Sequence, residues 1–84
     1  MADTQEMVLT EQWQQVAQGP CVLTLSPEAP DARWSARETA GAPADALRGH
    51  PLPLQKNTSM QVESGTRIYA RGRPGVLSFT VDPI

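Results

Sequence analysis

The chain has 84 residues, a net charge of −2, one cysteine and one histidine. This length allows one domain with a thin stability margin, because such a domain buries only about 60% of the surface that its unfolded chain exposes. Cys21 alone cannot form an internal disulfide, and His50 has no second soft ligand with which to hold a structural zinc ion. The acidic balance argues against an electrostatic contact with nucleic acid.

Burial against copies of itself is the remaining way for so short a chain to gain a larger core. By elimination we expect a homo-oligomer, although a well-packed monomer also satisfies the composition. The longest apolar runs are a few residues long, too short for a membrane-spanning helix. The start of the chain, MADTQE, is polar and acidic, unlike the basic and then apolar start of a secretory signal. We therefore expect synthesis in the cytoplasm and no membrane partner.

The N-terminal part of the chain contains one loose and one ambiguous segment. Residues 1–8 are expected to form a flexible arm, because chain termini are mobile unless they dock. Residues 9–18 (LTEQWQQVAQ) fit two interpretations, a helical turn capped by Thr10 or a short strand with a bulge, and we favour the strand. Gly19 and Pro20 end the segment in either case.

The middle of the chain contains two predicted strands and two irregular segments. Residues 21–25 (CVLTL) and 33–39 (RWSARET) are short and prone to β structure, and alternation in the second directs Trp34 to the core. Residues 40–49 are rich in Ala, Gly and Pro and are expected to form a loop. Two prolines confine residues 50–54 (HPLPL) to a sheet edge or an irregular link.

Strands are also predicted in the C-terminal third, over residues 59–62, 66–71 and 76–81. The last two are joined by a tight turn at 72–75 and are expected to form a hairpin. Together these segments predict an all-β fold, a small antiparallel sandwich or barrel of about six to eight short strands. The strands form a single β domain over residues 9–84.

No residue pattern points to catalysis. Cys21 and His50 are the only pair for thiol–imidazole chemistry, but the cysteine lies in an apolar strand, where a free thiol behaves as a small buried hydrophobe. The acidic residues are scattered, and no glycine-rich loop joins a strand to a helix. The sequence therefore predicts a protein without catalytic residues, bound metal or cofactor.

Arg67, Tyr69 and Arg71 share one face of a predicted strand, and Arg73 follows in the next turn. Three interpretations of this cluster remain open: a plain solvent-facing strand, a protein interface, or a surface for single-stranded nucleic acid, which an acidic chain supports poorly. Trp13 is either a core anchor or part of an aromatic platform. The interface interpretation selects Trp13, Arg67, Tyr69, Arg71 and Arg73 as interface residues.

Several features occur in order along the chain: Trp-x-x-Val-Ala-x-Gly at 13–19, a short apolar strand, Gly-His-Pro-Leu at 49–52, and Tyr-Ala-Arg at 69–71 before a glycine-containing turn and a final apolar strand. Over most of residues 9–82 the chain thereby resembles small β-sandwich virion proteins of tailed bacteriophages and prophages, which serve as head-decoration, cement or tail-fibre-associated subunits. The resemblance implies a non-enzymatic virion protein, often a homotrimer, that assembles with itself and with phage capsid or tail proteins.

An alternative from a different class is a small carbohydrate- or receptor-binding module. Trp13, Tyr69 and the nearby arginines would form its binding surface, and added glycans would then change the tryptophan fluorescence. An enzyme accessory or inhibitor domain has no positive feature in the sequence.

Overall fold

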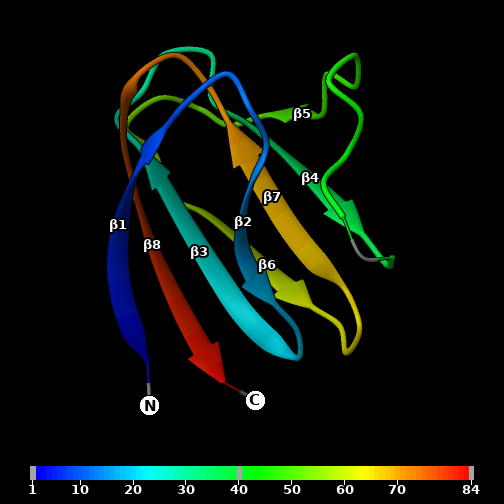
Figure 1. Ribbon diagram of the computed structural model, residues 1–84. Helices are drawn as coiled ribbons and strands as arrows, with labels where there is room; N and C mark the ends of the chain where they lie inside the picture. The colour runs from blue at the N-terminus through cyan, green and yellow to red at the C-terminus, as the bar shows by residue number, and fades with distance from the viewer. Residues whose placement is uncertain (1, 40, 84) are drawn as a thin grey trace.

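The computed structural model describes residues 2–39 and 41–83 and shows two four-stranded antiparallel sheets packed face to face (Figure 1). The first sheet has the strand order β1-β8-β3-β6, and the second has the order β2-β7-β4-β5. The all-β sandwich predicted from the sequence is confirmed. The strands are β1 (Asp3–Leu9), β2 (Gln14–Gln18), β3 (Cys21–Pro27), β4 (Arg33–Arg37), β5 (His50–Pro51), β6 (Thr58–Val62), β7 (Arg67–Arg71) and β8 (Gly75–Pro83).

Alternation of apolar and polar side chains explains the central strands of the first sheet. In β3, Cys21, Leu23 and Leu25 are at most 1% exposed, whereas the residues between them face outward. β8 pairs with β3 and places Leu77 and Phe79 on the same inner face. Residues two apart along a strand share one face of the sheet, so this pattern directs one face of each strand into the core.

The N-terminal segment forms a strand where the sequence suggests a loose arm. Asp3–Leu9 make up β1 and pair with β8 along their whole length. Leu9 is fully buried and Met7 packs against the core, but the other inward-facing positions carry the exposed polar residues Asp3 and Gln5. Because only two inward positions are apolar, the alternation that marks a strand is too short to detect in the sequence.

The two edges of the second sheet are short or irregular, as the sequence predicts. β2 contains a bulge at Val16, where its register on β7 shifts. The strand interpretation of residues 9–18 is confirmed for Gln14–Gln18, whereas residues 10–13 form the connection from β1. β5 consists only of His50 and Pro51 and pairs with the first two residues of β4. Its position at the edge agrees with the restriction that proline imposes on strands.

The last two strands are joined by a short turn, as predicted, but they lie in different sheets and do not pair with each other. β7 pairs with β2 and β4 in the second sheet, whereas β8 pairs with β1 and β3 in the first. Residues 72–74 therefore carry the chain from one sheet to the other. The backbone at the next residue, Gly75, lies close to Ala29, since a Cβ atom on Gly75 would be 2.7 Å from the Cβ of Ala29. Glycine is the residue that allows this contact.

Three connections meet at one end of the sandwich, at the top of Figure 1. The β1–β2, β3–β4 and β7–β8 connections each pass from one sheet to the other. The amide of Gly72 donates to the carbonyl of Thr10 at 2.8 Å, and the amide of Arg73 donates to the carbonyl of Pro30 at 3.1 Å. The β7–β8 connection is thus hydrogen-bonded to both of the others, and this links the two sheets directly.

The β2–β3 and β6–β7 connections are linked in the same way at the opposite end. The amide of Gly19 donates to the carbonyl of Thr66 at 2.9 Å, and the Gly19–Pro20 peptide bond is cis. Between the two ends lies one apolar core, against which Trp34 packs with its ring half-buried, as predicted. The buried members of this core are Leu9, Ala17, Cys21, Leu23, Leu25, Ala29, Ala32, Leu52, Val62, Ile68, Ala70, Leu77 and Phe79.

Truncation of Phe79 tests the assignment of the inner face of β8. Because this ring is only 6% exposed within the core, Phe79→Ala should lower the free energy of unfolding by about 3–5 kcal/mol. Val8→Ala is the control, since Val8 is 60% exposed and its truncation should change stability by no more than about 0.5 kcal/mol. Urea unfolding of both variants measures the difference, and equal effects would show that the assigned core face is wrong.

Candidate interaction site

The outer face of the second sheet carries the predicted arginine–tyrosine cluster together with a matching row from β4. Residues directly opposite each other on neighbouring strands point to the same face of a sheet. The register therefore brings four arginines onto this face, as two cross-strand pairs with a serine–tyrosine pair between them. The opposite positions are Arg33 with Arg71, Ser35 with Tyr69, and Arg37 with Arg67.

A loop of residues 41–49 covers one half of this face, and Arg71 holds it in place. The Arg71 guanidinium donates from Nη1 to the carbonyl of Asp45 at 2.8 Å and from Nη2 to the carbonyl of Leu47 at 2.7 Å. It also lies 4.6 Å from the centroid of the Trp13 ring. Charge-assisted hydrogen bonds and a cation–π contact thus converge on one side chain, which makes Arg71 a structural residue of the loop.

Two aromatic rings whose roles the sequence left undecided are buried on this side of the second sheet. Trp13 is 7% exposed and donates from Nε1 to the carbonyl of Ala44 at 3.3 Å, and Tyr69 is 5% exposed. Gly49 ends the loop with φ of +74°, and a Cβ atom there would lie 2.7 Å from Cη2 of Trp13. Neither ring belongs to the core cluster between the sheets. They form a small cluster of their own, of the kind that often lies under a long loop.

The residues selected from the sequence as an interface therefore have different positions. Trp13, Tyr69 and Arg71 are brought together, but beneath the loop rather than on an open surface. Arg67 is half-buried on the other half of the sheet face, and Arg73 is exposed in the β7–β8 connection. An interface on this side of the molecule would contact the loop and the arginines, while the two rings support the surface from below.

Sequence reasoning missed Arg33 and Arg37, which complete the two arginine pairs. Their spacing of four residues is the same as that of Arg67 and Arg71, so the signal is present in the sequence. It becomes visible only with the register, because pairing of β4 with β7 is what sets each arginine opposite another.

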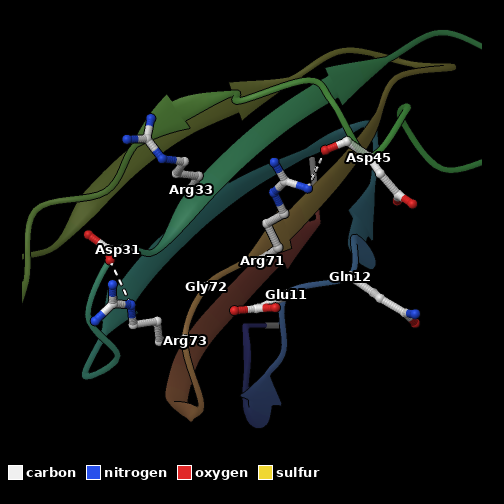
Figure 2. A pocket seen from close by; sticks show the side chains of 8 residues that line it. All are labelled: Glu11, Gln12, Asp31, Arg33, Asp45, Arg71, Gly72 and Arg73. Carbon is white, nitrogen blue, oxygen red and sulfur yellow. Dashed lines mark hydrogen bonds and ion pairs between the residues drawn. The ribbon is translucent and has the colours of Figure 1, made fainter.

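An open hollow of about 510 Å³ lies beside Arg71, at the end of the sheet face (Figure 2). Arg73 forms an ion pair there with Asp31, from Nε to Oδ2 at 3.0 Å. Three arginines and three acidic side chains line the hollow, so its formal charges balance, and its lining contains no thiol, hydroxyl or imidazole that could act as a nucleophile. The charged lining residues are Glu11, Asp31, Arg33, Asp45, Arg71 and Arg73.

The outer face of the first sheet has a different chemistry. Thr4, Thr80, Thr24 and Ser59 occupy one cross-strand row that runs over all four strands. Hydroxyl hydrogen bonds join Thr4 to Thr80 at 2.8 Å and Thr24 to Ser59 at 3.1 Å. The hydroxyl groups of this row are thus bonded to one another, in contrast to the arginine pairs of the second sheet.

The thiol and imidazole considered in the sequence do not form a catalytic pair in the structure. Cys21 is 1% exposed in the first sheet, and burial raises the pKa of its thiol above the ordinary value. His50 lies at the edge of the second sheet, where its ring centroid is 4.7 Å from that of Trp34. A nucleophilic cysteine needs a lowered pKa and a neighbouring base, and Cys21 has neither.

The two sheets differ in how their edges are protected. In the second sheet, the bulge in β2 and the prolines around β5 are features that discourage pairing with another chain. The first sheet ends in β1, a regular strand of seven residues, and in β6, a regular strand of five. In the described part of the chain no strand pairs with the outer side of either one.

Comparisons with known proteins supply no relative: no protein-family model, curated protein or solved structure matches the chain significantly. Among the described residues, no group of three His, Cys, Asp or Glu side chains is placed to hold a metal ion. Residues 2–39 and 41–83 likewise contain no helix long and apolar enough to cross a lipid bilayer. Function is therefore inferred from the surfaces described above.

Replacing Arg71 tests its role in holding the loop. In a Trp34→Phe background, where Trp13 is the only tryptophan, Arg71→Gln should shift the fluorescence emission to longer wavelength, because the loop no longer shields the indole from water. Amide exchange at Leu47, which donates to the carbonyl of Ala44, should accelerate as well. Arg73→Gln removes the same charge outside the loop contact and should change neither signal. An unchanged spectrum in Arg71→Gln would contradict the structural role.

The buried thiol predicts a pH dependence of stability. Because the pKa of Cys21 is raised in the folded state, the thiol of the unfolded chain ionises first as the pH rises. The stability that comes from keeping this thiol neutral is fully present below its ordinary pKa and is lost as the pH rises toward the folded value. Urea unfolding between about pH 8 and pH 10 should show a steeper loss in the native chain than in Cys21→Ala. Equal slopes would contradict the prediction.

Proposed function

We propose that this chain is a non-enzymatic structural protein that assembles with copies of itself through the two free edges of its first sheet. The observation that carries the proposal is β1, a seven-residue edge strand without proline, bulge or lysine. The outer backbone groups of such a strand are unpaired and offer a template for another strand. Strand addition satisfies these groups and buries apolar surface around the edge, including Val8, which is 60% exposed.

Charge favours pairing of β1 with the β6 edge of a neighbouring copy over pairing of β1 with itself. β1 carries Asp3 and Glu6 and no basic residue, so a β1–β1 contact brings four carboxylates together. β6 contains no charged residue, and the nearest charges before and after it, Lys56 and Glu63, are of opposite sign. Like charges across a strand pair are destabilising, whereas a neutral or basic neighbour avoids that repulsion.

A contact between two different edges is heterologous, and such contacts form closed rings when the rotation between copies closes. A homotrimer is the ring that we propose, in keeping with the sequence resemblance to small virion proteins of tailed bacteriophages. In that setting the ring is a head-decoration, cement or tail-fibre-associated subunit that binds capsid or tail proteins. Assembly also adds buried area that a single chain of this length lacks.

The carbohydrate- or receptor-binding alternative has lost the feature that supported it. Its aromatic platform requires exposed rings, but Trp13 and Tyr69 are 7% and 5% exposed beneath the loop. No other observation in the described residues favours it.

Light scattering after size exclusion tests the assembly. The native chain should give a discrete trimer, and Gln5→Lys in β1 or Gln61→Lys in β6 should shift it toward monomer, because a lysine at either edge must lose water when a strand adds. Gln15→Lys in the bulged β2 edge is the matched control and should leave the trimer intact. All three positions are exposed, so the unfolding free energy should be unchanged. A native monomer, or equal sensitivity at all three positions, would contradict the proposal.

A further inference from the structure

The other half of this sheet face contains an arginine pair without an acidic partner among the described residues. Arg37 on β4 lies directly opposite Arg67 on β7, and both side chains are half-buried. Gln18 on β2 is opposite Arg67 on its other side, so the row reads amide, guanidinium, guanidinium. No ion pair joins either arginine to another residue in the described ranges. Two like charges directly opposite each other repel, so this row is unfavourable unless something neutralises it.

The second arginine pair shows how the fold satisfies such a charge. Arg71, opposite Arg33, receives two carbonyl oxygens from the loop, those of Asp45 and Leu47. In the described residues, no loop carbonyl accepts a hydrogen bond from Arg37 or Arg67 in this way.

The hydrogen bonds of Arg37 also indicate that this pair requires a further acceptor. Its Nη2 donates to the hydroxyl of Thr39 at 3.1 Å, but its Nε is buried and has no hydrogen-bond partner among the residues that the structure describes. A buried donor without an acceptor is unfavourable, and most buried polar atoms in folded proteins are paired. An acceptor that draws the guanidinium outward would give Nε a partner and offset the repulsion from Arg67.

We propose that Arg37 and Arg67 form a carboxylate-binding site on the outer face of the second sheet. A carboxylate is planar and presents two oxygens, which match the paired N–H groups of guanidinium ions. Phosphate sites are usually built from backbone N–H groups at helix ends or nests, whereas the amides here belong to strands that are paired in a sheet. Gln18 and Thr39 add neutral polar groups beside the pair.

Two sources supply this chemistry: an Asp or Glu side chain of a protein partner, or a small free carboxylate. The assignment of the carboxylate to a protein partner rests on the proposed function. The affinity of the site for a carboxylate does not depend on that function. The site lies on the second sheet and the proposed assembly edges lie on the first, so each is tested without the other.

The experiment follows the Nε–Hε signal of Arg37 by NMR while acetate is added to the intact protein. Acetate should give a saturable shift. Arg67→Gln should weaken binding at least about tenfold, equivalent to about 1.4 kcal/mol, through loss of one guanidinium. Arg67→Lys keeps the charge but not the forked guanidinium, so its affinity for acetate should be intermediate. This variant keeps the test valid if the glutamine variant does not fold. Arg48→Gln, an exposed loop arginine, removes the same charge elsewhere and should leave the titration unchanged.

Two further titrations identify the ligand class and its source. Inorganic phosphate should bind more weakly than acetate, and tighter phosphate binding would overturn the carboxylate assignment. A blocked Glu-Glu peptide that binds tighter than acetate indicates a protein side chain, whereas equal affinity indicates a small free carboxylate. A linear, non-saturating response to acetate, or the same response in Arg67→Gln as in the native chain, would overturn the site itself.

Discussion

The structure depends on the hydrogen bonds that link its sheet-crossing connections. Every connection between consecutive strands except β4–β5 passes to the other sheet, so local hairpins do not hold the described sandwich together. The amide of Gly72 bonds to Thr10 and that of Arg73 to Pro30, which ties three crossings together at one end. These contacts join segments far apart in the sequence, and the first gives a partner to the amide of the buried residue Gly72. They also set β7 in register between β2 and β4, and that register places the arginines.

The two arginine pairs on the outer face of the second sheet need hydrogen-bond acceptors, and the fold supplies them differently to each pair. A cross-strand pair of arginines needs oxygen acceptors, because its charges repel and its many donors must be satisfied. At Arg71 the chain supplies carbonyls from its own loop and adds the ring of Trp13 from the small aromatic cluster. At Arg37 and Arg67 the described residues supply one side-chain acceptor, the Thr39 hydroxyl. The loop therefore acts toward Arg71 as the proposed carboxylate would act toward the other pair.

The fold class and most strands could be predicted from the sequence because alternation and proline or glycine boundaries are local signals. Residues 21–25 illustrate this, since their pattern alone identifies the centre of β3. The partner of a strand is not a local signal: the turn at 72–75 serves equally for a hairpin or for a crossing between sheets, and only the global packing selects the crossing. β1 could not be detected for a different reason, because the exposed polar residues Asp3 and Gln5 occupy two of its inward positions. The arginine rows needed the register of two strands that are distant in sequence.

The separation of the two proposed surfaces has a consequence for assembly. Strand addition at β1 and β6 uses only the edges of the first sheet, and the outer face of the second sheet takes no part in it. A ring built in this way would present one Arg37–Arg67 pair per subunit on the same side. Several weak carboxylate contacts made together by one ring bind far more tightly than any single contact, because each one raises the effective concentration for the next. A single chain has a hollow whose charges balance and one arginine pair free to bind, so we expect it to bind an acidic partner weakly. Self-assembly through one sheet is therefore what would make the other sheet an effective contact surface for an acidic partner.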